Sequence, residues 1–333
     1  MELKAVCTEH IYNCGSERYK KSLINSLRII KPLLTVKEFK KFVDKDLQFN
    51  SSHFNFGSYI QSSCELSHIV RMYAEFPQGF LYEPNLNLTS EKNKNKDVDF
   101  SFVAAGVRFN VEVKCFNYRE NNSNKTSITA LIPALPNGDL NITELESESI
   151  EFVRSRLLNI RDFFVSANDK FGIQADKEFN ILSICCYDLN DYIDVLECIS
   201  GHLGISFGRN ELFQEYAGNI NVNNFKKIDA VVVCNLGFLH KDFNRKSDGK
   251  YLNPWDYDNS FALGLQLHKN SGLHLDDDIG LLFKKIFNIH NDLYINFCKK
   301  NKYDTSSPLT SLPKYIEFLK ESGGYYFVNE NET

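Results

Sequence analysis

Strict alternation of apolar and polar residues on either side of a short turn most constrains how this chain can fold. Every second residue of 97–103 is apolar, and after Ala104-Ala105-Gly106 the same pattern continues from Val107 to Cys115. Successive side chains of a strand point to opposite faces of a sheet, so this pattern predicts a β-hairpin over 97–115. Glu112 and Lys114 fall on the polar face of its second strand.

Periodic patterns elsewhere predict helices and strands on both sides of this hairpin. The expected helices cover residues 16–30, 35–48, 57–76, 143–169, 192–203 and 279–298, with capping-box spacing at Thr35/Glu38 and at Thr143/Glu146. The expected strands cover residues 179–187, 228–234 and 261–267, and residues 116–142 read as a long polar connection. This order predicts an α/β fold with a central mixed β-sheet flanked by helices. We expect an N-terminal helical region at 1–50, a core with a C-terminal elaboration at 51–300, and a tail at 301–333.

Composition limits the kinds of partner. The 333 residues are 43% hydrophobic and 24% charged, which is typical of a folded protein. The formal net charge of −5 argues against a protein that coats nucleic acid without specificity. Residues 18–41 are nevertheless rich in lysine and arginine. This basic segment could contact a phosphate backbone or form solvated helix faces, and both interpretations stay open.

The nine cysteines form no Cys-x-x-Cys pair and no regular framework. Such usage is typical of reduced, buried thiols in a cytosolic protein, and no zinc site is expected from the spacing. The N-terminus lacks the apolar segment of a signal peptide, and no apolar run approaches the length that spans a membrane. We therefore expect a soluble cytoplasmic protein without a membrane partner.

The hairpin also brings together side chains that suit phosphodiester hydrolysis. A turn near 104–106 lets Asp99 approach Glu112 across the strand pair, on the same patch as Lys114. A hard divalent cation such as Mg²⁺ typically takes one or two carboxylates, and it lowers the pKa of a bound water. A lysine beside it can position or deprotonate that water.

The segments Asp99-Phe100 and Val111-Glu112-Val113-Lys114 resemble the PD-(D/E)XK nuclease superfamily, whose signature is an Asp followed on the next strand by Glu-x-Lys. The usual proline before the Asp is Val98 here. The resemblance covers residues 55–190 and implies a restriction-endonuclease-like core with αβββαβ order.

The resemblance also implies roles for single residues. Asp99, Glu112 and the backbone carbonyl of Val113 would bind Mg²⁺ or Mn²⁺, and Lys114 would serve the attacking water. Members often supply one more acid from the helix before the first strand, which corresponds to Glu65 here. Weaker candidates for that acid are Glu75 and Glu83.

By resemblance, the chain would be a metal-dependent DNA endonuclease in restriction or phage defence, acting as a homodimer or with a partner protein. Three alternatives stay open. The hairpin could be a solvent-facing element with an incidental ion pair between Glu112 and Lys114. The chain could keep the nuclease fold as a binding or assembly subunit that does not cut. It could also cut RNA.

Other candidate sites are weaker. The C-terminal set His268, His274, Asp276–Asp278 and His290 matches no zinc spacing and is more typical of a helix N-cap with an acidic first turn. Residues 240–250 read as a polar, basic loop. Trp255 and Tyr257 could stack on a base or pack a loop.

Overall fold

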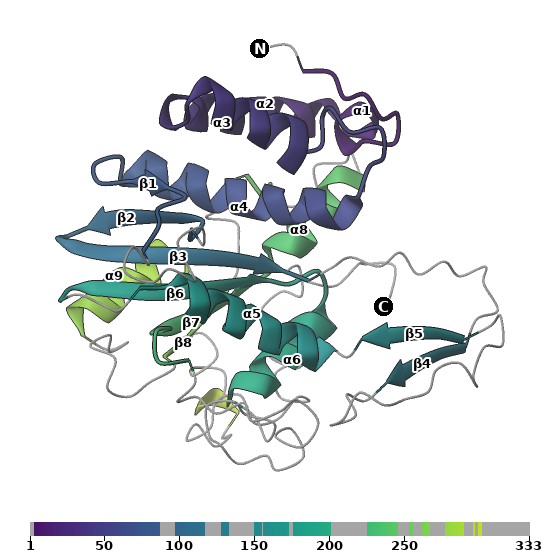
Figure 1. The fold of residues 1–333 in the computed structure, drawn as a ribbon. Coiled ribbons are helices and arrows are strands. Elements are labelled where there is room, and N and C mark those ends of the chain that lie inside the picture. Colours follow the sequence, from purple (N-terminus) through teal and green to yellow (C-terminus); the bar gives the residue numbers. More distant parts are fainter. Residues whose placement is uncertain are drawn as a thin grey trace.

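A computed structural model describes residues 3–86, 97–116, 128–132, 150–154, 156–172, 176–200, 225–245, 253–255, 262–266, 277–289, 296 and 299–301. These residues form an α/β fold around a six-stranded mixed sheet, which confirms the expected α/β class with a central mixed sheet flanked by helices (Figure 1). The strands, in spatial order, are β1 (Leu81–Tyr82), β2 (Phe100–Ala104), β3 (Val107–Cys115), β6 (Glu178–Cys185), β7 (Ala230–Cys234) and β8 (Ala262–Gln266). β3, β6 and β7 are parallel, while β1, β2 and β8 pair with their neighbours in antiparallel fashion.

Helices cover both faces of the sheet. They are α1 (Ile11–Cys14), α2 (Glu17–Ile30), α3 (Val36–Lys41), α4 (Phe56–Glu75), α5 (Arg156–Lys170), α6 (Leu189–Ser200), α8 (Leu236–Arg245) and α9 (Asp278–Ile286), with a 3-10 turn η1 (Lys31–Leu33) and a π-helical turn η2 (Phe42–Asp46). α4 and α8 lie on one side of the sheet, α5 and α6 lie on the other, and α2 and α3 form an outer layer beside α4 (Figure 1). None of the helices in this part of the chain combines the length and apolar character needed to cross a lipid bilayer.

The hairpin forms as its alternating pattern predicts, but its polar face is not solvent-exposed. Ala105 and Gly106 adopt φ angles of 50° and 76°, which are the left-handed values that a two-residue hairpin turn needs. The apolar face of β2 and β3 packs toward α4. The opposite face is also buried, with Glu112 at 0% exposure. The alternative of a solvent-facing hairpin is therefore wrong.

A buried ladder of polar side chains joins three strands on the α5 side of the sheet. The Ser101 hydroxyl donates to Asn110 Oδ1 at 2.7 Å, and Asn110 Nδ2 donates to Asn180 Oδ1 at 2.9 Å. Asn180 Nδ2 in turn donates to the carbonyl of Lys227 at 2.8 Å. Every member is partnered, so the ladder fixes the register of β2, β3 and β6 without leaving a buried polar group unsatisfied.

The expected helix over 143–169 is wrong over residues 150–154. Residues Ile150–Arg154 form a strand, β5, that pairs in parallel with β4 (Ile128–Ile132) inside the expected polar connection, and α5 begins at Arg156. Ile150 and Phe152 alternate with Glu151, and so short a pattern fits a strand as well as a helix. Pairing with β4 makes this segment a strand. The Thr143/Glu146 capping box lies outside the described residues.

Two further expectations near the C-terminus need correction. The helix expected over 279–298 is interrupted, since α9 ends at Ile286 and Asn288 turns the chain with φ of 51°, while Asn296, Lys299 and Lys300 are helical again. The expected loop from His240 is instead part of α8 up to Arg245. His240 is fully buried, and its ring centroid lies 4.5 Å from that of Trp255, so Trp255 packs the interior.

The expected N-cap at the C-terminal acidic run is confirmed, because Asp277 accepts a hydrogen bond from the Gly280 backbone at the start of α9. Its neighbours His268, His274, Asp276 and His290, with Tyr257, lie outside the described residues.

We predict that Asn110→Ala lowers the free energy of unfolding by about 1–3 kcal/mol, the typical penalty for buried polar groups left without partners. The Ser101 hydroxyl would lose its acceptor, and Asn180 Oδ1 would lose its donor. Urea denaturation measures the change. Asn50→Ala, at an exposed position, is the control and should change stability by less than about 0.5 kcal/mol. Equal unfolding midpoints for the two variants would contradict a stabilising ladder.

Candidate metal-binding active site

The two carboxylates and the lysine of the sequence motif meet in the folded chain. Asp99 directly precedes β2, and the pairing of Phe100 with Val111 directs it toward Glu112 on β3. The backbone N–H of Val113 donates to Asp99 Oδ2 at 2.6 Å, which holds that carboxylate against β3. The Lys114 ammonium lies 2.6 Å from Glu112 Oε1.

A second lysine, which the sequence analysis missed, completes this cluster. Lys170, the last residue of α5, places its ammonium 2.7 Å from Glu112 Oε1 and 2.9 Å from Oε2. The same nitrogen lies 3.8 Å from Asp99 Oδ1. Nothing local in the sequence marks Lys170, because the 58 residues that separate it from Glu112 are bridged only by the fold.

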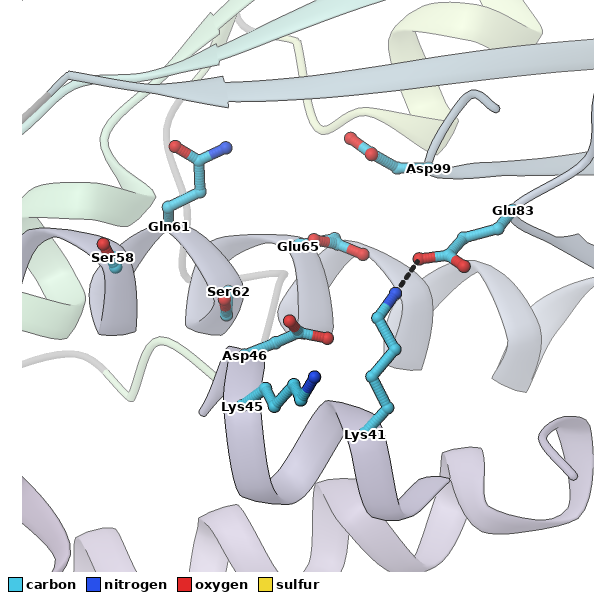
Figure 2. A pocket seen from close by; sticks show the side chains of 9 residues that line it. All are labelled: Lys41, Lys45, Asp46, Ser58, Gln61, Ser62, Glu65, Glu83 and Asp99. Carbon is cyan, nitrogen blue, oxygen red and sulfur yellow. Dashed lines mark ion pairs between the residues drawn. The ribbon is translucent and has the colours of Figure 1, made fainter. Parts of the chain in front are cut away.

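Glu65 reaches the same region from the opposite side, on α4. Glu65 and Asp99 both line an open cavity of about 320 Å³ and point into it (Figure 2). The other lining residues are Lys41, Lys45, Asp46, Ser58, Gln61, Ser62 and Glu83. Glu112 is not among them, since its side chain is fully buried behind Asp99. The motif therefore presents Asp99 to the cavity and keeps Glu112 in the interior.

The rim of the cavity carries further acidic side chains and two lysines from the N-terminal helices. Lys41 Nζ lies 3.7 Å from Glu83 Oε1, and Lys45 and Asp46 belong to the π-helical turn η2 (Figure 2). Glu83 is thus near the site, as expected for a weaker candidate. Glu75 is not, because it forms an ion pair within α4, at 2.8 Å, and does not line the cavity.

Burial, with the crowding of acids added to it, raises the pKa values of Glu65 and Asp99. Burial raises the pKa of Glu65 well above its usual range, and the charge of Asp99 adds to this effect. Burial and the neighbouring Glu112 also raise the pKa of Asp99, from 3.8 to about 7, against the opposing influence of Lys170 and Lys114. A divalent cation at this position would relieve the repulsion between the carboxylates.

The donor set fits a hard cation in its chemistry. Asp99, Glu112 and Glu65 offer only oxygen, the ligand that Mg²⁺ and Mn²⁺ prefer. No three acids in the described ranges bring their oxygens within 4.8 Å of one another. The Lys170 ammonium lies between Asp99 and Glu112, so a cation held by both would have to displace it. The metal-ligand role of the Val113 carbonyl stays a prediction.

We predict that the metal-free protein loses stability as pH rises from about 4 to about 7. In this window folded Asp99 keeps its proton while the unfolded chain has released it, so the folded state binds more protons. The loss should reach a few kcal/mol at most, because one pKa unit corresponds to about 1.4 kcal/mol.

Urea denaturation in the presence of a chelator, at several pH values, measures this slope. The Asp99→Asn variant is the control, because its side chain cannot ionise and its profile should be flatter. Parallel profiles for the two proteins would show that Asp99 ionises in its ordinary range.

No protein-family model, curated protein or solved structure matches this chain. Any functional assignment therefore depends on the residues of the site and their geometry.

Proposed function

We propose that this chain is a metal-dependent nuclease of the PD-(D/E)XK kind that hydrolyses DNA phosphodiester bonds, with a role in restriction or phage defence. The observation that carries the proposal is the meeting of three motif residues from two adjacent strands. Asp99 is hydrogen-bonded to the backbone of β3, and on β3 Lys114 contacts Glu112 at 2.6 Å.

The order of elements around the site supports a restriction-endonuclease-like core. Within the six-stranded sheet and its helices, α4, β1, β2, β3, α5 and β6 come in the order αβββαβ that the resemblance implies, with the separate β4–β5 pair inserted between β3 and α5. The motif Asp precedes β2, the motif Glu and Lys lie on β3, and β6 returns parallel to β3 after α5.

The proposal assigns a role to each side chain. Asp99, Glu112 and Glu65, with the Val113 carbonyl, would hold Mg²⁺ or Mn²⁺, which would lower the pKa of a bound water and neutralise charge on the phosphate. The Lys114 side chain is 16% exposed, so its ammonium can reach a water or a phosphate oxygen while it contacts Glu112.

Lys170 would act as a positioning residue. Its ammonium offsets the buried negative charge of Glu112 and fixes both oxygens of that carboxylate. Leaving a buried carboxylate without a partner is costly, and this lysine supplies the partner of Glu112.

The cavity beside Asp99 and Glu65 offers room for part of a nucleic acid strand. Its volume of about 320 Å³ is at the small end of ligand sites. Lys41 and Lys45 supply positive charge on its outer wall, which favours a phosphate backbone. The basic segment 18–41 would then contact the substrate through its last lysine, Lys41.

One observation favours a second candidate function, a subunit that binds nucleic acid without cutting it. Lysine ammonium groups occupy both oxygens of Glu112, and one of them also approaches Asp99. In a non-cutting subunit these ion pairs would be permanent and would replace the metal.

We predict that Lys114→Ala lowers Mg²⁺-dependent cleavage of plasmid DNA by about 100-fold or more, because general acid–base groups typically contribute at least that factor. Lys285→Ala, at an exposed position on α9, is the matched control and should cut like the wild type. Gel electrophoresis of time courses with Mg²⁺ and with Mn²⁺ measures the rates.

A wild-type protein that cuts neither DNA nor RNA would contradict the nuclease proposal, and so would equal rates for Lys114→Ala and the wild type. Binding without cutting would favour the second candidate. Faster cutting of RNA than of DNA would change the substrate class.

We also predict that Lys41→Ala combined with Lys45→Ala weakens DNA binding. The slope of log affinity against log salt should fall by about 1 for each lysine removed, as expected for lost phosphate contacts. Fluorescence anisotropy in Ca²⁺ measures binding apart from cleavage, with Lys285→Ala as control. An unchanged slope would exclude this wall from the DNA-binding surface.

A further inference from the structure

Three cysteines form a row across the parallel part of the sheet. Cys115 ends β3, Cys185 ends β6 and Cys234 ends β7. Cys115 pairs with Cys185, and Cys185 pairs with Cys234, so the three lie side by side in register. Registered residues of neighbouring strands project to the same face, so the sulfur atoms point in one direction. All three side chains are buried.

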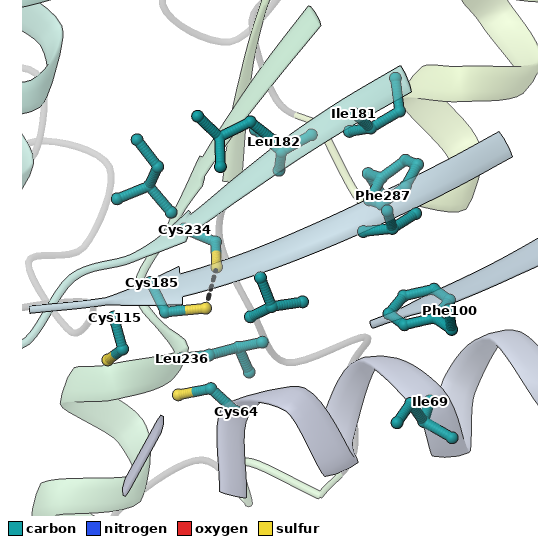
Figure 3. Close-up of a cluster of buried hydrophobic side chains, with 14 of the residues drawn as sticks. Cys64, Ile69, Phe100, Cys115, Ile181, Leu182, Cys185, Cys234, Leu236 and Phe287 are labelled. Atoms are coloured by element: carbon teal, nitrogen blue, oxygen red, sulfur yellow. Dashed lines mark hydrogen bonds between the residues drawn. The ribbon is translucent and has the colours of Figure 1, made fainter. Parts of the chain in front are cut away.

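Helix α4 brings two more donors to this row. Cys64 and His68 are four residues apart and therefore share one face of the helix. The Cys64 thiol interacts with those of Cys115 and Cys185. The sulfur atoms of all four cysteines gather between α4 and the strand ends (Figure 3).

The distances among His68, Cys185 and Cys234 suit a metal. Cys185 Sγ and Cys234 Sγ are 3.6 Å apart, and one ligand atom each of His68, Cys185 and Cys234 lies within 4.8 Å of the others. A tetrahedral Zn²⁺ with Zn–S bonds of about 2.3 Å places two sulfur atoms about 3.8 Å apart. No other trio of histidine, cysteine or acidic side chains in the described residues is as close.

His68 is oriented as a metal-binding histidine would be. Its Nδ1 lies 2.8 Å from the Cys64 carbonyl, which can only accept, so Nδ1 carries the proton. A backbone carbonyl in this position commonly fixes the ring of a ligating histidine and leaves Nε2 to the metal. Here Nε2 lies 2.9 Å from Ser183 Oγ, so the hydroxyl donates to it and competes for the lone pair.

We propose that His68, Cys185 and Cys234, with Cys64 as the fourth ligand, form a binding site for Zn²⁺ that is separate from the carboxylate cluster. One histidine and three cysteines are a common ligand set of closed structural zinc sites. Each ligating thiol loses its proton to solvent as it binds, and the Ser183 hydroxyl turns away from His68. The site uses sulfur and nitrogen, whereas the carboxylate cluster offers oxygen, so the two sites select different metals.

A zinc ion here would cross-link α4 to the ends of β6 and β7. The ligands come from three elements that are far apart in sequence, which explains why cysteine spacing gave no sign of the site. Burial raises the pKa of the Cys64, Cys185 and Cys234 thiols, so without metal they stay protonated and can pack as neutral groups. Entry of the ion is then expected during folding.

Metal content and cobalt spectroscopy test the proposal. Protein purified under reducing conditions from zinc-supplemented cells should contain about one Zn²⁺ per chain. Protein denatured with chelator and refolded with Co²⁺ should show thiolate-to-cobalt charge transfer and the strong visible bands of a tetrahedral site. Refolding removes the barrier that burial sets to metal entry.

Four variants separate this site from its surroundings. Cys185→Ala and Cys234→Ala should lose the zinc and the thiolate bands. Cys198→Ala, at a buried cysteine on α6, is the matched control and should keep both. Asp99→Asn should also keep both, which separates this result from the success or failure of the nuclease proposal.

The position of Ser183 gives a sharper test, because Ser183→Ala removes a competitor for His68 and should bind Co²⁺ at least as tightly as the wild type. Circular dichroism establishes that each variant is folded. The proposal would be overturned if the purified wild type contained no zinc and also showed no thiolate bands after refolding with Co²⁺. The cysteines would then only pack against one another as neutral thiols. Unchanged bands in folded Cys185→Ala would overturn it as well.

Discussion

The buried charge of Glu112 is the constraint on which the rest of the site depends. A carboxylate with 0% exposure loses its hydration, and the ammonium groups of Lys114 and Lys170, at 2.6 and 2.7 Å, offset that loss. Lys114 comes from the same strand, but Lys170 comes from the end of α5. The need to neutralise one carboxylate therefore ties α5 to β3, and the Asp99 hydrogen bond to Val113 ties the start of β2 to the same place.

The period of two in β3 explains how one strand serves two chemistries. Asn110, Glu112 and Lys114 project toward α5, where they join the polar ladder and the charge cluster. Residues of the other parity, from Phe109 to Cys115, project toward α4 and join the apolar and sulfur-rich core. Because Cys185 and Cys234 are in register with Cys115, the oxygen ligand Glu112 and these sulfur ligands are kept on opposite faces of the same sheet.

Features set by local physics could be predicted from the sequence. The hairpin follows from alternation across a short turn, and the Thr35/Glu38 capping box forms as its spacing indicates. Glu65, which only the resemblance singled out, lines the cavity. Features that depend on distant partners could not be predicted. Lys170 meets Glu112 only through the crossover of α5, β5 forms because β4 pairs with it, and the cysteine row exists only once three strands are in register.

Helix α4 links the two proposed sites. Cys64 and His68 face the strand ends, while Glu65, the residue after Cys64, faces the carboxylate cavity. Burial and then the charge of Asp99 raise the pKa of Glu65, and wherever both carboxylates are ionised their repulsion would move Glu65 away from Asp99. Burial of apolar residues along α4 opposes that movement, and a metal bound by Cys64 and His68 would also fix the rotation of the helix about its axis. Catalytic ligands must be held to within about 0.5 Å. A metal bound by Cys64, the residue next to Glu65, would therefore restrict the movement of Glu65.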